Sequence, residues 1–292
     1  MTIDIVSEEA EVRQTKRRVK KEKNWTKPIL IAGMFIYLTI FLLVPLIFIF
    51  AKAFEQGAEV YVAAVTESDA LSAIKLTLLV AVIAVPLNTV FGIAAAWVIT
   101  KFQFKGKQLL LSLVELPFAV SPVIAGLIFV LMFSTRGVLG PFITELGIKI
   151  IFSVPGIIIA TMFVTLPFVA RELIPVMQAQ GKAEEEAAIS LGANGWQMFL
   201  RVTLPNIKWG LLYGMILCNA RAIGEFGAVS VVSGRIRGMT NTMPLHVEIL
   251  YNEYQFSASF AVASLMSVLA LITLTIKAWI EWRTGKIKEV KE

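Results

Sequence analysis

Arg221 and Glu225 stand four residues apart in an otherwise apolar stretch, residues 209–234. Side chains at this spacing share one face of a helix, so opposite charges can pair there. Charges inside a membrane are costly and usually face a bundle interior or a cavity. The two residues therefore have two interpretations. They form a mutual ion pair that fixes the helix against its neighbours, or they line or gate a pore in which Arg221 attracts an anion.

Two helix breaks are predicted from glycine and proline. Gly224 and Gly227 flank Phe226 and indicate a local break, where backbone amides can meet an anion. Pro117 and Pro122 predict a second break or kink, and the carbonyls freed there must face protein or a water-filled cavity. The candidate pathway and gate residues are Ser121, Pro122, Arg221, Gly224, Glu225 and Phe226.

A charged segment, residues 183–205, lies between two apolar runs. Three consecutive glutamates open it, and acids suit the first turn of a helix. Gly192 stands where a left-handed C-terminal cap needs glycine. Asn194 and Gln197 form a capping-box pattern for a second helix. We expect a hairpin of two short helices, in which Pro205 ends the second helix before the next apolar run.

The hairpin has two physical interpretations. It packs on its own membrane domain, or it docks a partner in the cytosol. Ala187 and Ala188 keep the first helix thin, which lets a partner surface approach closely. The residues alone leave both interpretations open.

No residue is predicted to be catalytic and no metal site is predicted. Ser230 and Ser233 lack triad partners in the sequence. His246, the one histidine, lies in a predicted outer loop, 235–253, and is expected to be a surface residue. Cys218, the one cysteine, is expected to be a small core residue, because a single thiol builds neither a disulfide nor a thiolate metal site within one chain.

Hydrophobic residues make up 57% of the chain and charged residues 16%, whereas soluble domains carry about 25% charged residues. Five uncharged runs are long enough to cross a hydrocarbon layer of about 30 Å, and a sixth contains the charged pair. The sequence predicts an all-α membrane protein with six transmembrane helices and a cytosolic hairpin between spans 4 and 5. The expected spans are 28–51, 76–100, 116–135, 150–170, 209–234 and 254–276.

The predicted domains are a charged tail at 1–27, a transmembrane domain at 28–282 and a second tail at 283–292. Most of the 27 Lys and Arg residues lie in the tails, in 101–108 and in 171–208. Basic residues favour the cytosolic side, so both termini are expected in the cytosol. The net charge of +6 is attributed to this topology and to lipid contact. A nucleic-acid role is not expected, because the basic residues do not share one soluble face.

The hairpin carries the pattern E-A-A-x3-G-x9-V-x-L-P. This pattern resembles the signature loop of permease subunits of bacterial ATP-binding-cassette importers, with Val202 where isoleucine is usual. The resemblance implies the type I importer permease fold and a socket for the hairpin on a separate ATPase subunit. By that resemblance the ATPase-coupling residues are Glu186, Ala187, Ala188, Gly192, Leu204 and Pro205.

The resemblance extends from about residue 25 to residue 283. Segments 116–123 and 219–230 resemble permeases of the sulfate, molybdate and tungstate group, and 195–199 and 201–207 are similar to a permease of sulfate/thiosulfate importers. The family implies alternating access in the bacterial inner membrane. Its further subunits are a homologous second permease, two ATPase copies and a periplasmic or surface-anchored binding protein. The chain has no G-x-x-x-x-G-K-[ST] loop, so ATP and Mg are expected on the ATPase and no cofactor on this chain.

Two other functions stay open at this point. The same architecture could serve molybdate, tungstate or another solute. A stand-alone secondary carrier is the other alternative, but such carriers show inverted repeats and ion sites near the midplane. No such symmetry is evident in the sequence, and the hairpin would have no explanation.

Overall fold

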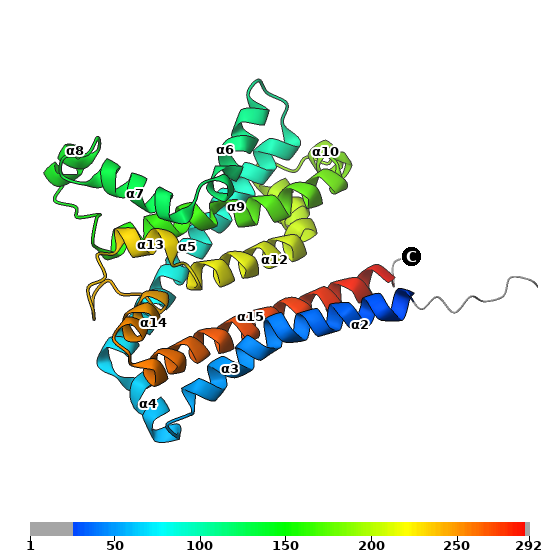
Figure 1. Cartoon of the computed structure of the whole chain (residues 1–292). Helices are drawn as coiled ribbons and strands as arrows, with labels where there is room; N and C mark the ends of the chain where they lie inside the picture. The colour runs from blue at the N-terminus through cyan, green and yellow to red at the C-terminus, as the bar shows by residue number, and fades with distance from the viewer. Residues whose placement is uncertain (1–25, 290–292) are drawn as a thin grey trace, which may run out of the picture. The chain divides into compact units, whose positions relative to one another are not determined.

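The computed structural model describes residues 26–289, and all its regular elements are helical (Figure 1). This confirms the predicted all-α class for that range. The charged tail predicted at 1–27 lies outside the described residues except for its last two, and so do the last three residues of the predicted tail at 283–292.

The first predicted span is a continuous helix with one wider turn. It consists of α2 (Thr26–Leu38), the π-helical segment η1 (Thr39–Leu43) and α3 (Val44–Ala53). The chain divides into two compact units, residues 1–48 and 49–292. Within the first unit, α2 has no buried side chain. An apolar helix without buried faces suits a lipid environment.

Three long helices form the core of the second unit: α5 (Ser68–Lys101), α9 (Val154–Gln180) and α12 (Leu204–Ile223). Apolar side chains of all three make one buried cluster. Gly92 of α5 lets α9 approach closely, because a Cβ there would lie 2.6 Å from the Cβ of Val169. The core therefore runs along the three helices, from Ala96 and Ile207 near the hairpin to Ala222 at the other end of α12.

Polar side chains also join α5 to α9 inside this core. Asn88 Nδ2 donates to the Met162 carbonyl at 3.0 Å and to Thr165 Oγ1 at 2.8 Å. Cys218 of α12 is fully buried next to them, with its Sγ 3.8 Å from the Thr165 carbonyl oxygen. The prediction that Cys218 is a core residue is confirmed.

Both predicted helix breaks are present. The third span is split into α6 (Lys107–Ala119) and α7 (Pro122–Phe133), which are bent by 106°. After α12 the chain leaves the helix at Gly224, and α13 (Gly227–Val232) begins three residues later. Proline at the start of α7 and glycine on both sides of Phe226 place the breaks where the sequence predicted them.

Three of the remaining helices lie at the end of the second unit away from the hairpin, and the fourth, the C-terminal helix, runs back along the unit. They are α4 (Ala58–Thr66), α8 (Gly140–Glu145), α14 (Met243–Asn252) and α15 (Phe256–Glu289). The helix α15 packs against α14 and α4. It continues to Glu289, beyond the predicted start of the C-terminal tail at residue 283.

Within the described range, four helices are long and apolar enough to cross a membrane: 26–53, 68–101, 154–180 and 256–279. The bent pair α6 and α7 raises this number to five if it counts as one span. The helix α12 is not among them. The predicted total of six spans therefore stays a prediction.

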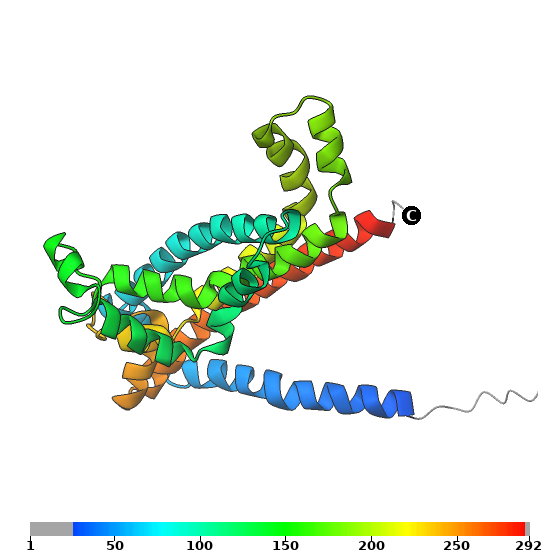
Figure 2. The same ribbon diagram turned by 90° about the horizontal axis from the view of Figure 1, so that it is seen from above.

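The predicted hairpin begins with α10 (Ala183–Ser190), which stands out from the ends of α9 and α12 (Figure 2). Its second arm is α11 (Gly195–Met198), and the π-helical segment η2 (Phe199–Thr203) joins α11 directly to α12. The prediction that Pro205 ends the second helix is wrong. The Leu204 amide bonds to the Phe199 carbonyl in a wider π turn, so the helix passes the proline instead of stopping.

Candidate functional site

Local sequence fixes the turn of the hairpin. Gly192 has φ +90°, the left-handed conformation predicted for it. The capping box is also confirmed. Gln197 N–H donates to Asn194 Oδ1 at 2.8 Å, and Asn194 N–H donates to Gln197 Oε1 at 3.1 Å. These bonds satisfy amides at the start of α11 and hold the turn in one shape.

The tip of the hairpin exposes large apolar side chains. Leu191 is 89% exposed and Trp196 is 75% exposed, and Ile189 is also exposed. Contiguous exposed apolar groups are typical of a surface that contacts another molecule. Of the predicted coupling residues, Glu186, Ala187 and Gly192 are exposed on this first arm and turn, and Ala188 is half-buried. Leu204 and Pro205 lie at the base instead, where Leu204 packs on the α5–α9–α12 core.

A buried polar network holds the base of the hairpin. Lys101, the last residue of α5, donates through Nζ to the Gly181 carbonyl at 2.5 Å and pairs with Glu185 Oε1 at 3.1 Å. Thr203 Oγ1 donates to the same Glu185 oxygen at 2.7 Å. The Lys101 side chain is 7% exposed. Sequence reasoning missed this network, because it treated Lys101 as one basic residue of a cytosolic turn.

Aromatic rings join the second arm to α5. The Phe199 ring lies 5.3 Å from Trp97 and 6.2 Å from Trp196, centroid to centroid. An apolar groove of about 520 Å³ runs along these rings. Trp196 and Leu200 nevertheless remain exposed.

The structure brings the two helix breaks together. The helix α7 packs against α13. A Cβ on Gly227 would lie 2.8 Å from Pro122 Cβ, and a Cβ on Gly126 would lie 2.7 Å from the Ala228 carbonyl oxygen. The predicted pathway residue Pro122 thus lies against Gly227, which directly follows the predicted pathway residues 224–226, although the two segments are far apart in the chain.

Arg221 and Glu225 form the ion pair that their spacing predicted, with Nη1 2.6 Å from Oε2. The Glu225 side chain is 1% exposed, and its Oε1 accepts a hydrogen bond from the Ala228 amide at 2.9 Å. Glu225 therefore ties the end of α12 to the start of α13 across the break. Arg221 is 32% exposed, and Gly224 and Phe226 are exposed. Attraction of an anion by Arg221 stays a prediction.

The prediction that His246 is a surface residue is wrong. The residue lies in α14 with 1% exposure, and its Nδ1 is 3.3 Å from Asn241 Nδ2. The loop before α14 folds inward because the Met243 amide bonds to Thr77 Oγ1 of α5 at 2.8 Å. Burial lowers the pKa of His246, and this effect outweighs the nearby carboxylates, whose negative charges raise it.

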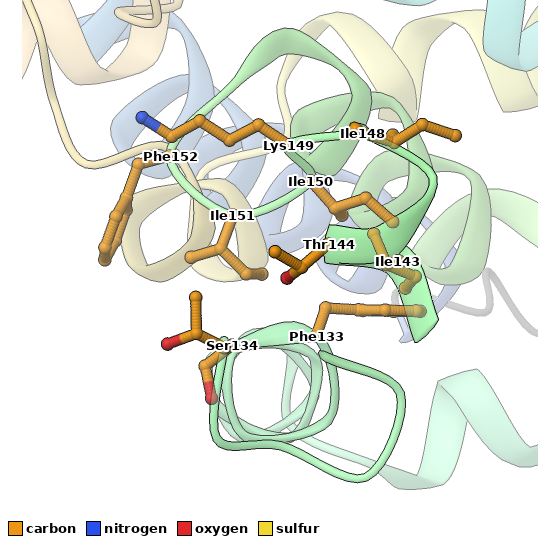
Figure 3. Close-up of a pocket in the computed structure, with 11 residues that line it drawn as sticks. Phe133, Ser134, Ile143, Thr144, Ile148, Lys149, Ile150, Ile151 and Phe152 are labelled. Carbon is orange, nitrogen blue, oxygen red and sulfur yellow. The ribbon is translucent and has the colours of Figure 1, made fainter. Parts of the chain in front are cut away.

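A cavity of about 460 Å³ lies between the end of α7 and α8 (Figure 3). Its lining is mostly apolar, with Phe133, Ile143 and Ile151 among the side chains drawn in Figure 3. Lys149 is its one charged lining residue. None of the predicted pathway residues lines it, so it is separate from the meeting of the two breaks.

Three comparisons bear on this arrangement. Residues 88–286 match the family model described as "Binding-protein-dependent transport system inner membrane component". The "Sulfate transport system permease protein CysW" of Escherichia coli (strain K12) is 53% identical over 94% of each chain. The "Sulfate transport system permease protein CysT" of the same strain is 34% identical over 86% of this chain and 91% of its own.

Among solved structures, a chain of a bacterial alginate ABC transporter, crystallised with an alginate-bound periplasmic protein, superposes with a TM-score of 0.73. The match covers 92% of this chain and 98% of that chain at 20% identity. At that identity the likeness shows the fold alone.

Proposed function

The chain belongs to the family of binding-protein-dependent transport system inner membrane components, and from this premise we propose that it forms the membrane pathway of an ATP-driven importer for sulfate and thiosulfate. The 53% identity to a sulfate permease over 94% of both chains supports the cargo. One structural observation carries the coupling to ATP, namely an exposed apolar tip on a hairpin whose base is fixed by buried charges.

The geometry supports a mechanical role for the hairpin. In this mechanism Glu186, Ala187, Ala188 and Gly192 dock in a socket on a separate ATPase subunit, two copies of which bind ATP and Mg. Closure of the ATPase pair draws the hairpins together. The movement passes into α9 and α12, which lead directly into and out of the hairpin. The access of the pathway then alternates between the two sides of the membrane.

The meeting of the two helix breaks is the proposed pathway region. Helix breaks in a membrane leave backbone groups that need protein or water as partners. Here the break at Ser121 and Pro122 packs against the break at 224–227. Arg221 is partly exposed beside this break, where its guanidinium can attract a dianion. The ion pair with the buried Glu225 stabilises the arginine charge within the membrane.

The proposed assembly contains two permeases, two ATPases and a periplasmic or surface-anchored binding protein. The second permease is a homologue of this chain, and the 34% identity to a CysT protein supports such a pair. The chain would cross the bacterial inner membrane several times, in contact with lipid, with both termini and the hairpin in the cytosol.

Uptake of radiolabelled sulfate tests this function in cells that lack the chain. Return of the wild-type chain should restore uptake, and Gly192→Trp should abolish it. The matched control is Gly106→Trp. Gly106 also has a positive φ (+96°, against +90° for Gly192) and no atom within 4 Å of its Cβ position, and it lies outside the hairpin. If the wild type leaves sulfate uptake unchanged but restores molybdate or tungstate uptake, the proposed substrate is wrong, whereas the proposed role as an importer permease is supported.

A further inference from the structure

The hairpin is attached to its two neighbouring spans in unequal ways. Its second arm is continuous with α12, through the π turn at 199–203. Its first arm is separated from α9 by only Gly181 and Lys182, and Gly181 has φ +68° and no atom within 4 Å of a Cβ position. A glycine of this kind is a joint at which a helix can swing with little steric opposition.

Lys101 bridges this joint from a third helix. Its Nζ bonds at 2.5 Å to the carbonyl of Gly181, the joint residue itself, and pairs at 3.1 Å with Glu185 Oε1 on the hairpin side of the joint. The helix α5, which carries Lys101, packs against α9 on the other side of the joint. The Glu185 side chain is 12% exposed and also accepts from Thr203 Oγ1. One lysine thereby links α5, the end of α9, α10 and the start of α12.

From this geometry we infer that Lys101 is a positioning residue for energy coupling, which locks the Gly181 joint and makes α5 move with the hairpin. Without the lock, a force on the tip bends the joint and reaches the spans only through the second arm and α12. With it, the force enters α5, whose core packing against α9 and α12 carries it into the bundle. The inference rests on the proposed function and adds Lys101, Glu185 and Thr203 to the machinery.

A buried charge pair is suited to this role. Removing one partner leaves the other charge in a site of low exposure, so a single substitution has a large effect. A second tie reinforces the lock, because Asn206 of α12 donates to Glu184 of α10. That bond is exposed and does not touch α5, so it holds the two arms of the hairpin together without fixing the joint.

The transport test uses the complete importer in proteoliposomes, with sulfate uptake and ATP hydrolysis measured on the same preparation. We compare Lys101→Met, which removes the charge, with Lys101→Arg, which keeps it. The matched control is Lys105→Met, because Lys105 is an exposed lysine of the loop that follows α5. Sulfate moved per ATP hydrolysed should fall about tenfold in Lys101→Met, within the usual range of coupling between sites. It should stay near wild type in Lys101→Arg and Lys105→Met.

The lysine and the glutamate should act as one unit. Lys101→Met with Glu185→Gln should lose no more coupling than Lys101→Met alone, because each change removes the same contact. A parallel fall of uptake and hydrolysis in Lys101→Met would overturn the inference, since it would make Lys101 a residue of assembly only. An unchanged ratio would overturn it as well.

Hydrogen exchange separates this inference from the proposed function. In the purified chain, Lys101→Met should speed exchange of the amides of 183–190 severalfold and leave those of α14 unchanged. Unchanged exchange in 183–190 would contradict the lock whatever the importer carries. Absence of sulfate transport by the wild-type complex would count against the proposed cargo, while faster exchange would still support the lock.

Discussion

The base of the hairpin and the meeting of the two helix breaks hold helices together by different means. At the base, the ends of long side chains make the contacts, as in the pairing of Lys101 with Glu185. At the breaks, Gly126 lies against the backbone of Ala228 and Gly227 lies against the ring of Pro122, so neither position has room for a side chain.

The two kinds of contact differ in how much a substitution disturbs the helices that make them. A contact between side-chain ends can be removed without moving the helices that carry it. A glycine contact cannot accept one carbon atom without a shift of backbone. The base is therefore suited to transmit movement, and the breaks are suited to fix the shape of the pathway. Substitutions at the breaks should therefore lower the stability of the chain, whereas substitutions in the hairpin should lower coupling or binding.

The largest effect is expected at the breaks. In Gly126→Val the new Cβ would lie 2.7 Å from the Ala228 carbonyl oxygen, which is backbone and cannot rotate away. Overpacking of this kind costs about 3 kcal/mol, so the folded chain should be lost from the membrane. Gly224→Ala is the control, because its nearest neighbour would lie at 3.6 Å. Immunodetection and thermal unfolding after extraction measure both. Normal folding of Gly126→Val would remove the distinction between the regions.

A smaller effect is expected from the ion pair that bridges the second break. Arg221→Gln leaves the Glu225 carboxylate buried without its partner. We expect a cost of about 2 kcal/mol, less than the roughly 3 to 5 kcal/mol of a fully buried pair, because the Arg221 side chain is 32% exposed. Arg221→Lys should recover part of the stability, and Arg221→Gln with Glu225→Gln should recover more. Thermal unfolding measures these changes. Sulfate uptake by the same variants tests anion attraction, which fails if Arg221→Gln transports with wild-type rate and apparent affinity.

At the hairpin tip we expect lost binding with normal stability. Leu191→Asp places a charge at the centre of the exposed apolar tip. Central apolar contacts of an interface are worth about 2 kcal/mol, so affinity for the ATPase subunit should fall about 30-fold. Val138→Asp is the control, because Val138 is 87% exposed and lies outside the hairpin. Binding of the purified ATPase to the permease pair measures both, and equal affinities would contradict docking at the tip.

The smallest effect concerns His246, away from both regions. Burial lowers its pKa below the ordinary value of 6.5, so the folded chain keeps the ring neutral while the unfolded chain takes up a proton below that pH. Stability should therefore fall as the pH drops below 6.5, by at most about 1.4 kcal/mol per pH unit. Thermal unfolding at about pH 7.5 and about pH 5.5 measures it. His246→Gln should show a smaller fall, and an identical fall would show that other groups are responsible.

Sequence predicted the features that depend on neighbouring residues. The capping box of Asn194 and Gln197, the left-handed Gly192 and both helix breaks come from short-range rules, and all are present in the structure. The spacing of Arg221 and Glu225 likewise predicted their ion pair.

Features that depend on contacts between distant segments could not be predicted in this way. Lys101 meets Glu185 across 84 positions of the chain only because α5 and α9 pack side by side. His246 is buried because its loop bonds to Thr77, far upstream. The passage of the helix through Pro205 depends on a π turn, for which the sequence carries no simple rule.

Coupling through the hairpin tip is tested by measuring sulfate uptake and ATP hydrolysis together in proteoliposomes that contain the complete importer, with wild-type chain or with Leu191→Asp. We expect wild type to transport sulfate only with ATP, and Leu191→Asp to lose uptake while the two permeases still fold and pair. Wild-type uptake by Leu191→Asp would contradict the claim that the hairpin tip couples ATP hydrolysis to the pathway.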